Sequence, residues 1–183
     1  SPTSSISFDN NQPIQALGGT NLALGKIATA SSVHTSNSAS KAVDGTTLTA
    51  WSSTFAEPAW IYVDLGSSQA IQQVVLIWES AYGLEYKIEG SNDTVNWNLL
   101  NQEKHGDGAI DYLAVNGSWR YVRMYGIQRG TGWGFSILEF QIFDIAQPVP
   151  PVEPYIPSLP FKPTSQTLFS DDFSSGTTAQ WQI

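Results

Sequence analysis

The sequence contains no cysteine, a single methionine and only two histidines among its 183 residues. Without cysteine, the chain can form neither a disulfide framework nor a thiolate metal site. With so few histidines, a metal centre built on several imidazole ligands is disfavoured as well. Long apolar runs are also missing, since no run approaches the roughly 18 residues that a membrane-spanning helix needs.

Charged residues are scarce, and most of them are acidic. Lys and Arg number 8 against 16 Asp and Glu, which gives a formal net charge of −8. Binding to nucleic acid requires clustered Lys and Arg side chains that neutralise phosphates, and the sequence has no such cluster. The same charge disfavours binding to anionic membrane surfaces.

Signatures of catalysis are equally scarce. The glycine-rich, serine and histidine motifs of common hydrolases and nucleotide-binding enzymes are missing. Two carboxylate pairs are conceivable as acid and nucleophile of a glycosidase, but nothing in the sequence supports either of them. These pairs are Glu79 with Glu85 and Asp107 with Asp111. We therefore expect a protein that is not itself an enzyme.

Aromatic residues are plentiful, at 12% of the chain, and they occur in short runs separated by turn-forming residues. No stretch has the apolar repeat of a long helix. The alternating or continuous apolar character of the runs predicts strands. The predicted strands lie at 60–66, 71–79, 86–92, 97–103, 120–127 and 135–144. Short strands at this spacing indicate a β-sandwich or barrel.

The composition changes along the chain and predicts its domains. The predicted strands lie in residues 20–145, which we expect to form one domain after an N-terminal linker of residues 1–19. The prolines of residues 146–166 disfavour helix and central strand, so this segment is predicted to be an extended linker. Residues 167–183 contain aromatic side chains that can pack and are interpreted as the start of a truncated β-rich module. A tail that packs on the first domain is the alternative.

Segments of residues 21–144 carry a family resemblance. Taken in order, they are NLALGKIATASS, KAVDGTTLTAWSS, WIYVDLGSSQAI, SNDTVNWNLL, RYVRMYGI and ILEFQIF. They resemble the coagulation factor 5/8 type C, or discoidin-like, domains, and among these most closely the carbohydrate-binding modules of family 32. The resemblance implies an all-β jelly-roll sandwich of about eight antiparallel strands with neighbouring termini. The missing disulfide favours the bacterial sugar-binding branch.

The segment KAVDGTTLTAW combines a carboxylate, a glycine and three threonines, which suit a hard cation such as Ca²⁺. The resemblance implies a second carboxylate from the last strand, Glu139, which is otherwise flanked by apolar residues. The predicted ligands of a structural Ca²⁺ are Lys41, Asp44, Thr46, Thr49 and Glu139. The alternative is a turn built around Asp44 with Glu139 in water.

Sugars bind to proteins through flat aromatic rings and directed hydrogen bonds. The resemblance places such a site in the loops at one end of the sandwich. Trp133, which lies between two glycines, is the predicted stacking platform. Further predicted contacts are Phe55, Glu79, Tyr82, His34 and Asp107.

Alternatives remain for these residues. Trp133 can be a core residue, Tyr82 can pack beneath the loop, and His34 can be an ordinary surface residue. The tryptophans that fall in or beside strand patterns are predicted to belong to the core. These are Trp51, Trp60, Trp78, Trp97 and Trp119.

Relatives often carry an arginine just before the tryptophan of the calcium loop, where this chain has Ala50. Sugars bearing carboxylates or sulfates are therefore disfavoured. A neutral β-glycan is favoured, and a chitosan-like amino-sugar polymer is plausible because Glu79 can pair with an ammonium group. Our hypothesis is a monomeric, non-catalytic carbohydrate-binding module of a secreted bacterial polysaccharide-degrading enzyme, either hydrolase or lyase. The alternatives are a discoidin-type adhesion module that binds a protein or lipid, and a structural spacer.

Overall fold

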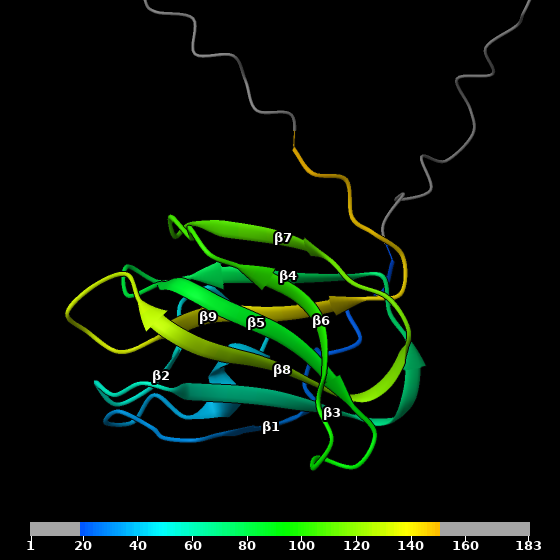
Figure 1. Ribbon diagram of the computed structural model, residues 1–183, viewed down its shortest axis with the longest axis horizontal. Coiled ribbons are helices and arrows are strands. Elements are labelled where there is room, and N and C mark those ends of the chain that lie inside the picture. The colour runs from blue at the N-terminus through cyan, green and yellow to red at the C-terminus, as the bar shows by residue number, and fades with distance from the viewer. Residues whose placement is uncertain (1–18, 151–183) are drawn as a thin grey trace, which may run out of the picture. The chain divides into compact units, whose positions relative to one another are not determined.

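The computed structural model describes residues 19–150, which form two antiparallel β-sheets packed as a sandwich (Figure 1). The strands are β1 Ile27–Ala30, β2 Trp51–Ser52, β3 Ala59–Ala70, β4 Gln73–Trp78, β5 Gly83–Ser91, β6 Asn98–Glu103, β7 Ile110–Ala114, β8 Ser118–Arg129 and β9 Ser136–Phe143. A short 3-10 helix, η1, covers Ala39–Ala42. The described part of the chain has no helix long and apolar enough to cross a membrane. The predicted all-β sandwich is confirmed.

One sheet has five strands in the order β1-β3-β8-β5-β6, and the other has four in the order β2-β9-β4-β7. Every predicted strand is present, but β1, β2 and β7 were not predicted. These three strands lie at sheet edges, where one side is open to water and the apolar pattern is weak. The predicted N-terminal linker up to residue 18, the linker after residue 150 and the segment 167–183 lie outside the described residues.

Alternation along the strands separates core from surface. In β3, Ile61 and Val63 are fully buried between the sheets, whereas Trp60 and Tyr62 point to the outer face. The rings of Trp60 and Tyr62 stack there with centroids 5.7 Å apart, and the Tyr62 ring lies 5.8 Å from that of Trp97. The prediction that Trp60 and Trp97 belong to the core is therefore wrong. Strand periodicity of two places Trp60 on the half-exposed outer face, and Trp97, which directly precedes β6, packs there against Tyr62.

The other three tryptophans of that set agree with the prediction. Trp51 is fully buried and Trp78 is 4% exposed, and both belong to the core cluster. Trp119 is half-buried and packs against that cluster.

The two ends of the described segment meet. Asn21 forms an isolated bridge with Phe143, and the Gln147 side chain donates a hydrogen bond to the Gly19 carbonyl at 3.3 Å. The neighbouring termini implied by the resemblance are thus present. The loop that follows β8, yellow in Figure 1, lies at the opposite end of the sandwich from these ends. A binding surface built on that loop is therefore kept clear of the chain ends.

Candidate functional site

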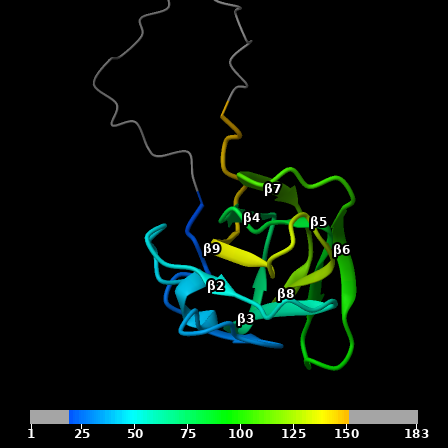
Figure 2. The same ribbon diagram turned by 90° about the vertical axis from the view of Figure 1, so that its left-hand side faces the viewer.

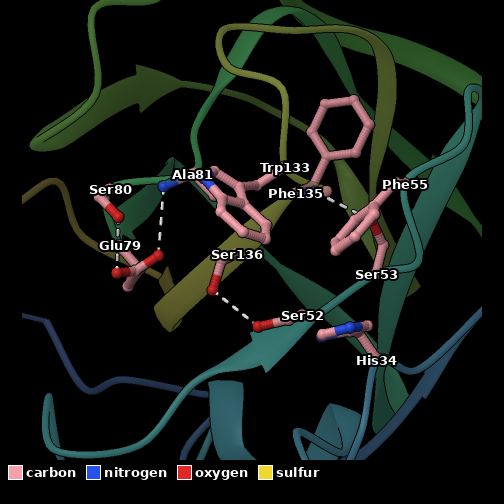
Figure 3. A pocket seen from close by; sticks show the side chains of 11 residues that line it. His34, Ser52, Ser53, Phe55, Glu79, Ser80, Ala81, Trp133, Phe135 and Ser136 are labelled. Atoms are coloured by element: carbon pink, nitrogen blue, oxygen red, sulfur yellow. Dashed lines mark hydrogen bonds between the residues drawn. The ribbon is translucent and has the colours of Figure 1, made fainter.

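The end of the sandwich that faces the viewer in Figure 2 carries a hollow of about 230 Å³ between loops (Figure 3). Four connections supply its walls, namely those after β1, β2, β4 and β8. The residues that line it are His34, Ser52, Ser53, Phe55, Glu79, Ser80, Ala81, Trp133, Gly134, Phe135 and Ser136. Four of the six predicted sugar contacts are thus brought together at one place.

Trp133 is 63% exposed on the loop after β8, so the alternative that it is a core residue is excluded. The Phe55 ring, 47% exposed, lies perpendicular to the indole with centroids 5.5 Å apart. The His34 ring lies 4.8 Å from that of Phe55. Large exposed aromatic rings that gather in a hollow are unusual on a protein surface and indicate a binding surface. Whether these rings contact a sugar stays a prediction.

Hydrogen bonds between neighbouring segments hold the residues at the floor of the hollow together. The Ser52 and Ser136 hydroxyls lie 2.8 Å apart where β2 pairs with β9, and the Phe135 amide donates to the Ser53 hydroxyl at 2.9 Å. The Ser53 amide in turn donates to the Phe135 carbonyl. Sequence reasoning missed these residues. No local pattern marks them, because strand pairing in space brings them together.

Glu79 directly follows β4. Among the residues that the structure describes, it is the one acidic residue in the lining of the hollow, and this lining contains no Lys or Arg. The Ser80 hydroxyl donates to one carboxylate oxygen at 2.7 Å, and the Ala81 amide donates to the other at 3.2 Å (Figure 3). The hydrogen bond from Ser80 is the main reason why the pKa of Glu79 lies below its ordinary value. The side chain is exposed and presents an oriented negative charge to the hollow.

Tyr82 and Asp107 are not among the residues that line the hollow. The half-buried Tyr82 ring packs between Gly108 and Gly130; a Cβ added to Gly130 would collide with it, and one added to Gly108 would lie 3.2 Å from it. Tyr82 therefore packs beneath the loops, which was the alternative. Asp107 is exposed on the connection between β6 and β7. Any contact that either residue makes with a ligand stays a prediction.

The predicted cation loop folds around Asp44. One Asp44 carboxylate oxygen accepts a hydrogen bond from the Thr46 amide at 3.1 Å, and the other accepts one from the Thr49 hydroxyl at 2.6 Å. The Lys41 carbonyl lies 3.5 Å from that hydroxyl. Gly45 has a φ of +84°, a left-handed conformation that favours glycine and turns the chain back on itself.

Glu139 of β9 contacts this loop from the last strand. Its side chain is 2% exposed, and one carboxylate oxygen accepts a hydrogen bond from the Gly45 amide at 2.9 Å. The second oxygen is buried without a hydrogen-bond partner. Burial, together with the nearby Asp44 charge, raises the pKa of Glu139. The alternative that Glu139 lies in water is excluded.

The donor set fits a calcium ion. Two carboxylates, the Thr49 hydroxyl and the Lys41 carbonyl lie together, and the buried Glu139 oxygen without a hydrogen-bond partner suits a cation ligand. Within residues 19–150, no group of three or more His, Asp or Glu side chains gathers as a metal site of another kind. The predicted site needs only two carboxylates, so this finding does not conflict with it.

Comparison with known proteins identifies the family. The sequence profile of the F5/8 type C domain matches residues 27–140. None of the curated protein sequences compared with the chain matches it significantly.

Several solved structures are similar to this chain over about two thirds of its length. Chitosan-binding module 1, derived from a chitosanase/glucanase of Paenibacillus sp. IK-5, is 44% identical with a TM-score of 0.66 and covers 68% of this chain and 98% of its own. Chitosan-binding module 2 of the same enzyme, solved in complex with chitotriose, is 42% identical with a TM-score of 0.66. The match covers 67% of this chain and 99% of the module.

A family 32 module of Clostridium perfringens in complex with galactose shares the fold, at 18% identity and a TM-score of 0.61, and covers 69% of this chain and 98% of its own. The resemblance found in the sequence is thereby confirmed. The chain belongs to the F5/8 type C domain family, and its structural neighbours there are carbohydrate-binding modules of family 32.

Proposed function

We propose that this module binds a chitosan-like polymer of amino sugars in the hollow at the loop end of the sandwich. The observation that carries the proposal is the pairing of an exposed indole, Trp133, with an oriented carboxylate, Glu79, in one hollow. The indole provides a flat face for the apolar side of a pyranose ring. The carboxylate forms a charge-assisted hydrogen bond with the ammonium group of glucosamine.

Three further facts favour the amino sugar over the neutral β-glycan that the sequence alone favours. Modules 42% to 44% identical to this chain are named for binding chitosan. The net charge of −8 attracts a cationic polymer and raises its local concentration. The residues that line the hollow include no Lys or Arg to repel it.

We also propose that a structural Ca²⁺ holds the loop from Lys41 to Thr49 against β9. Asp44 and Glu139 supply the carboxylates, and Thr49 supplies its hydroxyl. When bound, the cation neutralises two neighbouring carboxylates and ties the loop to the last strand. This loop leads directly into β2 and then to Phe55. The bound cation therefore supports one wall of the hollow without touching a sugar.

The biological role that fits these sites is that of an accessory domain in a secreted bacterial enzyme that degrades polysaccharides. Binding of the module raises the effective concentration of an attached catalytic domain at its substrate. The chitosan-binding relatives derive from a chitosanase/glucanase.

Affinity electrophoresis and calorimetry against a panel of glycans test the proposed function. The panel contains chitosan oligosaccharides, their N-acetylated forms, a neutral β-glucan and galactose. We expect the tightest binding to chitosan, in the millimolar to micromolar range of about −4 to −8 kcal/mol. Tighter binding to the neutral β-glucan would contradict the amino-sugar assignment, and binding to none of the glycans would overturn the function itself.

The role of Glu79 predicts a pH profile. Because its pKa lies below the ordinary value, Glu79 stays ionised between about pH 5 and 8, whereas the sugar amine titrates in this range. Affinity for chitosan should therefore fall as pH rises and the amine loses its proton. Glu79→Gln should weaken binding at pH 5 by about tenfold, as expected for a charge-assisted hydrogen bond, and flatten the profile.

A control variant separates this contact from overall charge. Asp93→Asn removes the same charge from an exposed residue that does not line the hollow, so its pH profile should match the wild type. Binding of the N-acetylated oligosaccharide should not change over this pH range. An unaltered profile in Glu79→Gln would show that Glu79 does not pair with the amine.

A further inference from the structure

We infer that Arg129 is a positioning residue that locks the two aromatic loops of the hollow to each other. The inference rests on the proposed function, since it assigns a role within the same binding site. Arg129 is the last residue of β8 and does not line the hollow itself. Its side chain reaches both the loop that carries Phe55 and the loop that carries Trp133.

Towards the Phe55 loop, Arg129 contacts Glu57 twice. The Arg129 backbone amide donates to a Glu57 carboxylate oxygen at 2.6 Å, and the guanidinium Nε donates to the same oxygen at 3.1 Å. Glu57 lies two residues after Phe55, so this double contact anchors the tip of that loop to the end of β8. The pKa of Glu57 is lowered, chiefly by the hydrogen bond from the Arg129 amide.

Towards the Trp133 loop, the guanidinium uses its other end. Nη1 donates to the Trp133 carbonyl at 3.2 Å and lies 3.4 Å from the Gly132 carbonyl. The planar guanidinium thus links a carboxylate of one loop to backbone carbonyls of the next. A lysine cannot reproduce this, because its ammonium group lacks the rigid fork of donors.

The composition of the Trp133 loop explains why such a link is needed. In the sequence GTGWG, Gly132 and Gly134 flank Trp133, and Gly130 lies three residues before it. Glycine has more backbone freedom than any other residue, so the loop loses much entropy when it is ordered. A loop held in its bound conformation before the sugar arrives avoids this cost on binding.

Arg129 also affects the charge around the hollow. The ionised Glu57 is engaged by Arg129, with side chains that are 34% and 22% exposed respectively. Glu79 therefore remains the carboxylate that faces the hollow without a cationic partner among its lining residues. The ion pair thereby focuses the attraction for an ammonium group on a single position.

The same strand offers a matched control. Arg120 also lies on β8, and its Nε pairs with Asp64 of β3 at 2.9 Å. This pair lies on the outer face of the five-stranded sheet, and neither residue lines the hollow. Arg120→Ala therefore removes one Arg–carboxylate pair and one positive charge from β8 while leaving both aromatic loops as they are.

The experiment compares Arg129→Ala and Arg120→Ala in the full chain. Calorimetry with a chitosan hexasaccharide measures affinity, and ¹⁹F NMR of protein labelled with 5-fluorotryptophan reports on the ring of Trp133. The Trp133 resonance is assigned by its loss in Trp133→Phe. We expect Arg129→Ala to weaken binding by about tenfold, the cost of ordering loop and side chains on binding, and to broaden or shift that resonance. Arg120→Ala should do neither.

Two further variants keep the inference testable if Arg129→Ala folds poorly. Arg129→Lys should restore part of the affinity through the pair with Glu57, and Glu57→Gln should weaken binding from the opposite loop. An unchanged affinity and Trp133 resonance in these variants, or equal changes in Arg120→Ala, would overturn the inference. If the wild type binds no glycan, the proposed function fails, whereas the Trp133 resonance still decides whether Arg129 orders the loop.

Discussion

Trp133→Ala is expected to remove most of the affinity for chitosan while leaving the fold intact. The indole is 63% exposed, so its loss takes little buried area from the core, but it removes the largest flat surface of the hollow. Truncation of a central tryptophan at a binding site costs about 2 kcal/mol or more, which corresponds to about 30-fold in affinity. Calorimetry with chitosan oligosaccharides measures this loss, and thermal unfolding checks that stability is unchanged.

Trp97→Ala is the matched control for that result. Trp97 is less exposed than Trp133 and lies on the outer sheet face under the Arg123 guanidinium, which stands 3.9 Å from the centre of its ring. This change should lower stability because the contacts with Arg123 and Tyr62 are lost, and it should leave glycan affinity unchanged. Equal glycan affinities for the wild type and Trp133→Ala would contradict the proposal that Trp133 stacks on the sugar.

Removal of calcium is the second large expected effect. A ligand present at about 100 times its Kd stabilises the folded state by about 2.7 kcal/mol. For a domain of this size, such a loss lowers the melting temperature by about 10 °C. Calorimetric scans with and without a calcium-selective chelator measure the change. A melting curve that the chelator leaves unchanged would exclude a stabilising Ca²⁺.

Glu139→Gln tests the ligand set, because glutamine keeps an acceptor for the Gly45 amide but removes the buried charge. In chelator, this variant should be at least as stable as the wild type, since an unpaired buried carboxylate is costly. The calcium-dependent rise in melting temperature should disappear. Glu89→Gln, which alters a carboxylate paired with Arg123 on the outer face, should retain that rise.

Much of this molecule follows from local features of the chain. Alternation in β3 and the apolar run of β9 predict strands without any tertiary information, since side chains on a strand alternate between two faces. Gly45 beside Asp44 marks a sharp turn rich in oxygen ligands, and glycines around Trp133 mark an exposed loop. These signals suffice for a β-sandwich or barrel, for the turn at Asp44 and for an exposed Trp133, whereas the loop-end site and the role of Glu139 came from the family resemblance.

Other properties depend on which segments meet in space. Alternation does not say which face of β3 is outside, and for this reason the prediction that Trp60 belongs to the core is wrong. The serine floor exists because β2 pairs with β9 in one register. Arg129 gave no sequence signal, because its partners are 72 residues before it and three to four residues after it.

By itself, the sequence determined that the chain forms a β-sandwich or barrel, because periodicity and turn chemistry are local properties. Its resemblance to a known family implied the sandwich and an aromatic, acidic site in the loops at one end. Only the tertiary structure decided that Trp133 is open to water, that Tyr82 packs beneath the loops and that one oxygen of Glu139 is buried without a partner. Exposure and hydrogen bonding depend on what the remaining chain places beside a residue, and that is known only once the sheets have paired and packed.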